Sequence, residues 1–401
     1  MAPGAFADIT QAQLLPRVVR LGGGLYGAVF SLMKLVPARY ILGKAHDRGD
    51  LGPDTVIVET TSGTFGLALA MQAALMRRRF ILVSDPVIDA NLRRRLTDLG
   101  AEVVICEQPL AVGGYQEARL RKVAQIRAER ADSFCPEQYA NPDNPASYAI
   151  VAEQLARVLG DVDCVVGPVG SGGSMCGTVR ALRAHRADVT AVGVDTHHSV
   201  LFGPTDGPRP LRGLGNSLMP PNLDHRVFDE VHWCTAAEAY AATRELHRTH
   251  ALFQGPTSGA AYRVARWWSR RHPDARCVVL LPDEGYRYQQ TVYDDDWLAA
   301  QGYGAAAQPA EPVGAQHGDV PHQGGGGRRV DELLLGEHHQ VRQVDGGRPA
   351  QLVGEFGGRR LTVEDPAGTL ADGRGQAAGA AHHACSSSST RTGPVCPTAS
   401  R

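Results

Sequence analysis

Short apolar runs and longer amphipathic segments alternate along residues 54–303 of the chain. The short runs are rich in β-branched residues, which is typical of strands buried in a parallel sheet; they lie at 55–58, 80–83, 103–106, 164–169, 189–194 and 277–281. The longer segments carry apolar residues at helical spacing; they lie at 65–76, 88–99, 117–130, 148–159, 175–185, 236–249 and 259–271. This alternation predicts an α/β fold with mostly parallel sheets covered by helices on both faces.

The composition changes near Gly302. Residues 304–401 are rich in Gly, Ala, Pro, Gln and His, and the one short apolar piece, 330–335, cannot form a core. Two interpretations stay open for this segment: a disordered low-complexity tail, or an artefact produced by out-of-frame translation of GC-rich DNA. Its histidine pairs lack a ligand set of fixed geometry, so we expect no metal site.

Composition and charge narrow the class of protein further. The 401 residues suffice for two domains, and 43% hydrophobic with 21% charged residues is ordinary for a soluble globular protein. The net charge of -1 does not suggest a nucleic-acid or membrane partner. Eight scattered cysteines without a CxxC pair argue against zinc and disulfides. Together with the absence of a signal-peptide pattern, they indicate a cytoplasmic location.

A glycine-rich loop, Gly170-Ser171-Gly172-Gly173-Ser174, joins a predicted strand to a predicted helix. Backbone N–H groups at such a turn converge on an anion, and the helix N-terminus adds partial positive charge. Serine hydroxyls can add further donors. The loop therefore predicts a phosphate site, and the alternative is a tight strand-to-helix turn without a ligand.

Three other segments occur with this loop in a fixed order. Lys34 lies 25 residues before Glu59, which opens the sequence ETTSGTFG; the glycine loop follows, and then GPTSGAA at 255–261. In order and spacing, from about residue 15 to residue 298, these segments resemble the fold-type II pyridoxal-phosphate enzymes of the cysteine synthase family. This chain departs from the family around Lys34 and at Thr64-Phe65, where the family has Asn-Thr.

The resemblance implies a role for each motif. Lys34 would form the Schiff base with the cofactor aldehyde and later move protons as a general base. The implied cofactor-binding residues are Lys34, Thr64 near the ring hydroxyl, the phosphate-binding Gly170, Ser171, Gly172, Gly173 and Ser174, and Thr257 at the pyridine nitrogen. The implied substrate-binding residues are Thr61, Ser62 and Gly63 for the α-carboxylate, Gln138 in the pocket and Gly213 near its mouth. The segment 282–288 is expected to be a salt-bridged turn near the cofactor.

Simpler interpretations of these motifs stay open. Lys34 could be an amphipathic-helix lysine that reaches for water. The hydroxyl residues around Thr61 and Thr257 could be N-caps of the helices that follow them, a role compatible with ligand binding.

The family resemblance also implies an architecture and an activity. We expect residues 1–150 to contain a smaller, mobile α/β domain and the lysine, residues 151–303 to form a second α/β domain with the phosphate site, and the cofactor to lie between them in a homodimer. The implied reaction is β-elimination or β-replacement on an activated L-serine, O-acetylserine or O-phosphoserine. Sulfide would yield cysteine; the alternatives are an amine that yields a 2,3-diaminopropionate, a serine or threonine dehydratase, and a degenerate paralogue that binds the cofactor without catalysis.

Overall fold

The computed structural model describes residues 5–61, 63–111 and 113–303 and the short strands at 327–328, 355–356 and 359–360. The chain divides into two compact units, residues 1–343 and 344–401. In the second unit, β12 (Glu355–Phe356) pairs antiparallel with β13 (Arg359–Arg360). Apart from the short strands, the segment 304–401, for which the sequence predicts disorder, lies outside the described residues.

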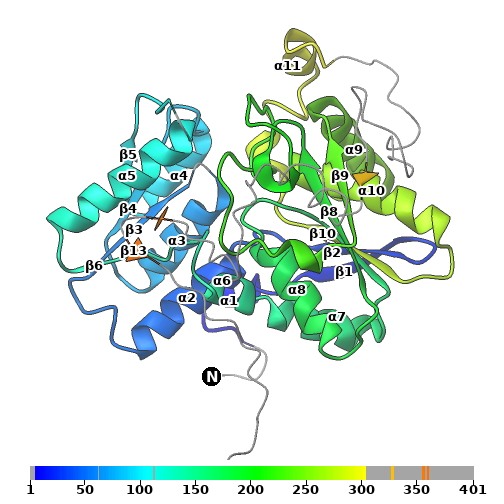
Figure 1. Ribbon diagram of the computed structural model, residues 1–401, viewed down its shortest axis with the longest axis horizontal. Coiled ribbons are helices and arrows are strands. Elements are labelled where there is room, and N and C mark those ends of the chain that lie inside the picture. The colour runs from blue at the N-terminus through cyan, green and yellow to red at the C-terminus, as the bar shows by residue number, and fades with distance from the viewer. Residues whose placement is uncertain are drawn as a thin grey trace, which may run out of the picture. The chain divides into compact units, whose positions relative to one another are not determined.

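The first unit contains a four-stranded sheet of order β5-β4-β3-β6, in which all neighbours are parallel (Figure 1). Its strands are β3 (Val56–Thr60), β4 (Phe80–Ser84), β5 (Ala101–Ile105) and β6 (Ser133–Phe134). Apolar side chains from α2 (Leu35–Asp47), α3 (Thr64–Leu75) and α4 (Ala90–Asp98) form one core cluster with it, and those from α5 (Gly114–Glu129) form another. The sheet is therefore covered on both faces.

The second sheet of this unit has seven strands in the order β1-β2-β10-β7-β8-β9-β11. They are β1 (Arg17–Gly22), β2 (Leu25–Val29), β7 (Cys164–Pro168), β8 (Thr190–Thr196), β9 (Glu230–Cys234), β10 (Cys277–Leu281) and β11 (Gly327–Arg328). The five central strands are parallel, and the two edge strands are antiparallel. One core cluster contains α7 (Ala149–Leu159) and α8 (Gly173–Arg183), and the other contains α9 (Ala236–His250) and α10 (Pro256–Arg271).

The hairpin β1-β2 was not predicted from the sequence. Its turn uses Gly22 at φ +121 and Gly23 at φ +53, conformations that favour glycine. β2 then pairs with β10, more than 240 residues later, so that both ends of the region 17–303 contribute to one sheet. The pairing of β2 with β10 spans too great a sequence distance to leave a local signal.

The predicted α/β fold with mostly parallel sheets is confirmed. Several helices start earlier than predicted because their glycine or proline residues belong to the first turn: α8 begins at Gly173 and α10 at Pro256. The remaining short helices are α1 (Ile9–Ala12), α6 (Asp143–Ala146), η1 (Val200–Phe202), η2 (His225–Val227), η3 (Gly285–Tyr288) and α11 (Asp295–Ala300). No helix in the described ranges is long and apolar enough to cross a membrane.

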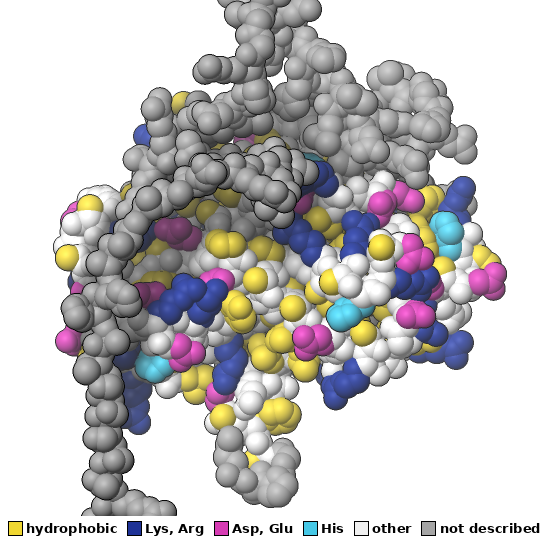
Figure 2. All heavy atoms as spheres, turned by 60° about the horizontal axis from the view of Figure 1, so that its bottom comes forward, with side chains coloured by type: hydrophobic (Ala, Val, Ile, Leu, Met, Phe, Trp, Pro, Cys, Tyr) yellow, Lys and Arg dark blue, Asp and Glu magenta, His cyan; other side chains and the backbone are white. Residues whose placement is uncertain are grey.

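The described surface mixes charges of both signs. On the face drawn in Figure 2, basic and acidic side chains are interspersed with apolar ones. This pattern agrees with a net charge of -1 for the whole chain.

Candidate active site

The predicted phosphate loop, Gly170–Ser174, follows the carboxyl end of β7 and enters α8. Gly172 has φ +81, and a Cβ added there would lie 2.7 Å from the backbone of Leu223. A Cβ on Gly173 would lie 2.3 Å from Oδ1 of Asn144. Only glycine fits these two positions. Among the described residues no side chain caps the N-terminus of α8, so its backbone N–H groups remain available to an anion.

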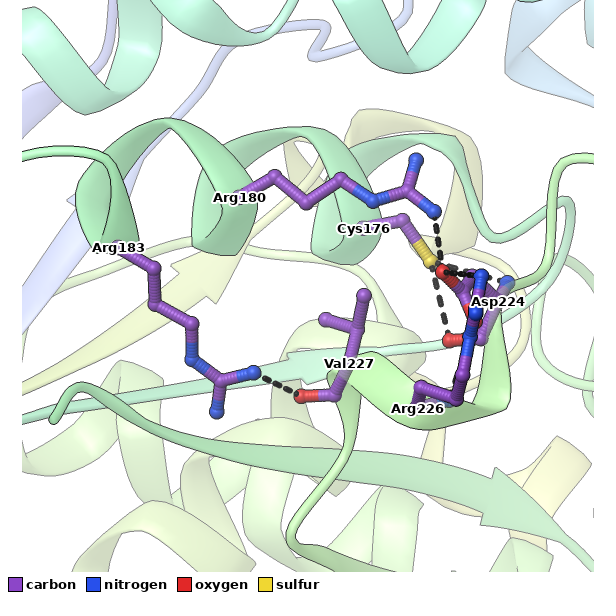
Figure 3. Close-up of polar contacts among 6 residues, drawn as sticks. All are labelled: Cys176, Arg180, Arg183, Asp224, Arg226 and Val227. Atoms are coloured by element: carbon purple, nitrogen blue, oxygen red, sulfur yellow. Dashed lines mark hydrogen bonds and ion pairs between the residues drawn. The ribbon is translucent and has the colours of Figure 1, made fainter. Parts of the chain in front are cut away.

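A polar brace holds the loop from outside (Figure 3). The backbone N–H of Asp224 donates to Sγ of Cys176 at 3.5 Å, and this thiol donates to the Asp224 carbonyl at 3.8 Å. The Asp224 carboxylate accepts from Arg180 at 2.5 Å and from Arg226 at 3.0 Å. These bonds fasten the segment that covers Gly172 to the first turns of α8.

Lys34 lies immediately before α2, in the segment that follows β2. Its Nζ donates to Oγ of Ser171 at 3.4 Å and lies 6.0 Å from the ring centroid of Phe65. Burial withdraws the ammonium from water and lowers the pKa of Lys34 to about 8. The structure thus brings the predicted Schiff-base lysine to the predicted phosphate loop.

The predicted carboxylate loop connects β3 to α3. Thr61 is buried, and its Oγ1 accepts from the backbone N–H of Gly63 at 3.1 Å. Gly63 is the N-cap of α3, where no described side chain makes a capping bond, and Thr64 is the first helical residue. Free N–H groups at this helix start suit a carboxylate. Ser62, the remaining predicted residue of the loop, lies outside the described residues.

Gln138 joins the two predicted loops. Its Nε2 donates to the Thr60 carbonyl at 3.2 Å, and its backbone N–H donates to Oε2 of Glu59 at 3.1 Å. Its own carbonyl accepts from Asn144 at 2.6 Å and from Asn222 at 3.1 Å. Gln138 therefore connects β3 to the residues that pack against the phosphate loop.

Glu59 is a buried carboxyl group behind the carboxylate loop. Its Oε1 accepts from the backbone N–H of Thr60 at 2.7 Å. Burial raises the pKa of Glu59 to about 7, although these backbone bonds oppose the shift. Glu59 was not among the predicted site residues; its position at the end of an apolar strand, before a polar loop, was the available signal.

Thr257 and Gly213 complete the set of predicted residues. Thr257 is buried in the first turn of α10. A Cβ on Gly213, which has φ +79, would lie 3.7 Å from Cγ2 of Thr257, and a Cβ on Gly170 would lie 3.4 Å from the Gly213 carbonyl. The structure therefore places Gly170, Gly213 and Thr257 side by side.

Sequence reasoning missed a group of arginines near these loops. Arg119 on α5 donates to Oδ2 of Asp85 at 2.7 Å, and both side chains are buried. Burial lowers the pKa of Arg212; Asp85 opposes this change, whereas the positive charges of Arg119 and Arg287 reinforce it. Arg209 adds to the same repulsion. Arg287 lies in the predicted turn 282–288 and Arg212 precedes Gly213, but sequence separations of up to 168 residues hid their proximity to Arg119.

These residues fit a cofactor that carries a phosphate and an aldehyde. The glycine loop provides a close-fitting cradle, the N-terminus of α8 provides donors, and the amine of Lys34 reaches the same place. Nδ2 of Asn144 donates to Oγ of Ser171 in this loop at 3.5 Å. Within those ranges, no group of three or more His, Cys, Asp or Glu side chains could hold a metal ion.

Comparisons with known proteins agree with this geometry. Residues 33–283 match the family model described as "Pyridoxal-phosphate dependent enzyme". The N-(2-amino-2-carboxyethyl)-L-glutamate synthase of Cupriavidus metallidurans is 36% identical over 71% of this chain and 88% of its own length. The enzyme of the same name from Ralstonia nicotianae is 34% identical over 78% of this chain and 97% of its own length.

Solved structures show the same fold. The cysteine synthase of Entamoeba histolytica has a TM-score of 0.66 and 22% identity, and covers 73% of this chain and 92% of its own. The O-acetylserine-dependent cystathionine β-synthase of Helicobacter pylori has a TM-score of 0.66 and 26% identity, and covers 72% and 98%. The chain therefore belongs to the pyridoxal-phosphate-dependent enzymes of fold type II, in the cysteine-synthase-like group that its motifs predicted.

Proposed function

We propose that the enzyme catalyses a β-replacement in which an amino acid adds, through its amino group, to the β-carbon of an activated L-serine. The observation that carries the proposal is the 34–36% identity to two N-(2-amino-2-carboxyethyl)-L-glutamate synthases. The name of their product describes a three-carbon amino acid joined at its β-carbon to the nitrogen of L-glutamate. We therefore favour L-glutamate or a similar amino acid as acceptor, in place of the sulfide that the family resemblance first suggested.

Each predicted site residue has a distinct role in the proposed reaction. Gly170–Ser174 hold the phosphate of the cofactor, and Thr257 contacts its ring nitrogen. Thr61, Gly63 and their neighbours bind the substrate α-carboxylate. When bound, pyridoxal phosphate supplies an electron sink for negative charge at the substrate α-carbon. Lys34 takes the α-proton, because a pKa of about 8 leaves part of its population uncharged near neutral pH.

The arginines support an ester with a charged leaving group. Arg212 precedes Gly213 beside the predicted pocket, and burial lowers its pKa; Asp85 opposes this shift, and neighbouring arginines add to it. Close positive charges repel one another unless an anion lies between them. We therefore propose O-phospho-L-serine in preference to O-acetyl-L-serine.

Product analysis tests the proposal. The protein with pyridoxal phosphate is given either ester together with L-glutamate or sulfide, and products are identified by mass spectrometry. We expect release of inorganic phosphate that matches formation of the L-glutamate adduct. Formation of cysteine from sulfide, in place of the L-glutamate adduct, would contradict the proposed acceptor. Formation of pyruvate with every acceptor would contradict the proposed β-replacement.

Two further expectations remain part of this proposal. As in the family generally, we expect a homodimer, which sedimentation analysis checks. We also expect the protein to act in the cytoplasm, which fractionation of cells that produce it checks.

A further inference from the structure

Arg287 follows the seven-stranded sheet of the first unit, and its side chain lies beside the predicted substrate loop, which follows the four-stranded sheet of the same unit. It lies in η3, the short turn that follows β10 of the seven-stranded sheet. Its Nη1 is 4.0 Å from the position that a Cβ on Gly63 would take. Gly63 follows β3 of the four-stranded sheet and begins α3. The guanidinium therefore lies beside the start of α3, where no described side chain caps the backbone N–H groups of the first turn.

The bonding of this guanidinium is incomplete. Nε of Arg287 is buried and has no hydrogen-bond partner in the described ranges, where the side chain also forms no ion pair. The salt bridge expected in this turn is thus not made by Arg287. The two acidic residues nearest in sequence bond elsewhere: Oδ2 of Asp283 accepts from the Tyr288 hydroxyl at 3.0 Å, and Oε1 of Glu284 accepts from Arg17 at 3.4 Å. Leaving a buried N–H of a charged group unpaired is costly, so this Nε points to a missing acceptor.

The charge of Arg287 is nevertheless maintained. Burial opposes it, but Tyr288, Asp283 and Asp89 together raise the pKa of Arg287. The guanidinium also lies over the Tyr288 ring, 5.4 Å from its centroid. These groups orient a positive charge without using its hydrogen-bond donors.

Arg119 shows what a structural arginine in this region looks like. Its Nη1 donates to Asp85 at 2.7 Å, and the two buried charges neutralise each other. Nε is buried and unpaired in both arginines within the described ranges, but Arg287 also lacks an ion pair like that of Arg119, and it adds to the positive charge felt by Arg212. An anion between these two arginines would supply acceptors to Arg287 and relieve their mutual repulsion.

We propose that Arg287 is a binding residue for an anionic group, carboxylate or phosphate, of a substrate held against the Gly63 loop. The inference rests on the proposed function for the identity of the substrates. Because Arg287 and Gly63 follow strands of different sheets, the bound anion would link the two sheets across the site.

Binding measurements on the protein loaded with pyridoxal phosphate test this inference without turnover. Inorganic phosphate and L-glutamate are titrated separately by calorimetry into wild type, Arg287→Gln and Arg287→Lys. The KM values for O-phospho-L-serine and O-acetyl-L-serine are measured in parallel. The control is Arg121→Gln, which removes a side chain that is 70% exposed and paired with Glu117 on α5.

We expect Arg287→Gln to raise at least one of these Kd or KM values roughly tenfold, which corresponds to about 1.4 kcal/mol. Arg287→Lys should recover part of the loss, because it keeps the charge and loses the forked geometry. If only the Kd for phosphate and the KM for O-phospho-L-serine rise, Arg287 binds the leaving group. If the KM values for both esters rise equally, Arg287 binds the substrate α-carboxylate. If only the Kd for L-glutamate rises, Arg287 binds the acceptor.

Constants that match those of the Arg121→Gln control in every titration would overturn the inference. The result is separate from the fate of the proposed reaction. Loss of anion binding in Arg287→Gln supports the site even if wild type forms another product. Full activity of Arg287→Gln in the proposed reaction rejects the site and leaves the reaction intact.

Discussion

The predicted cofactor side and the predicted substrate side of the site are built differently. On the seven-stranded sheet, Gly172 and Gly173 allow direct packing by backbone and by Asn144, and Asp224 braces the loop with neutralised charge. On the four-stranded sheet, the loop at Thr61 lies over buried Glu59, whose pKa is raised to about 7. Steric fit dominates the first side, and electrostatics dominates the second.

This difference explains which parts of the site can be predicted from a short sequence motif. A glycine loop between strand and helix can be recognised in the sequence as a candidate phosphate site, because its geometry is local. The environment of the substrate depends on partners far apart in sequence, such as Asp85 with Arg119 or Glu59 with Gln138. The surroundings of the substrate could therefore not be predicted from a short motif.

The largest expected effect comes from the residue that belongs to both sides. Lys34→Ala should abolish the visible absorbance band that depends on the lysine and reduce turnover by about 10² to 10⁴-fold or more, the usual contribution of a general base. The spectrum and the rate are measured with added pyridoxal phosphate. Lys122→Ala is the control, since that lysine only donates to Gln125 on the surface of α5. An unchanged absorbance band in Lys34→Ala would show that Lys34 does not bind the cofactor.

Steric fit on the cofactor side is tested by Gly172→Ala against Gly49→Ala. Both glycines have φ +81, but a Cβ on Gly172 meets backbone at 2.7 Å, whereas nothing lies within 4 Å at Gly49. Left-handed backbone alone costs about 1–2 kcal/mol. Gly49→Ala should lose only that stability, and Gly172→Ala should in addition weaken pyridoxal phosphate binding by roughly 100-fold, about 2.7 kcal/mol. Fluorescence titration measures the Kd, and equal affinities would refute the close fit.

The sequence predicted those parts that depend on neighbouring residues. The strand at 277–281 agrees with β10, and the loop before α8 was placed correctly between strand and helix. The missing strands lacked a clear pattern: β1 and β2 form a hairpin whose β2 also pairs with distant β10, and β9 mixes polar Glu230 with apolar residues. Arg287 was predicted to stabilise a turn, because its position beside Gly63 exists only once both sheets have formed. The roles of the individual site residues stay predictions.

Electrostatics on the substrate side is tested by the pH dependence of stability. The folded-state pKa of Glu59, about 7, exceeds its ordinary value of 4.5, so between these pH values the folded protein holds a proton that the unfolded chain has lost. Wild-type stability relative to Glu59→Gln should therefore fall by roughly 2–3 kcal/mol as pH rises from 4.5 to 7, and change little outside that window. Urea unfolding at several pH values measures the difference, with exposed Glu129→Gln as control. A difference that is independent of pH would mean that Glu59 is ionised in both states.

The smallest expected effect concerns the brace behind the phosphate loop. Asp224→Asn keeps the shape of the side chain and its backbone contacts with Cys176, but removes the charge that Arg180 and Arg226 share. These ion pairs are partly exposed and contribute about 1 kcal/mol or less each. We therefore expect the Kd for pyridoxal phosphate to rise only about two- to fivefold, compared with no change for Asp188→Asn, whose carboxylate is 71% exposed. If Asp224→Asn instead weakened binding as much as Gly172→Ala, the phosphate loop would depend on charge as strongly as the substrate side does, and the contrast between the two sides would fail.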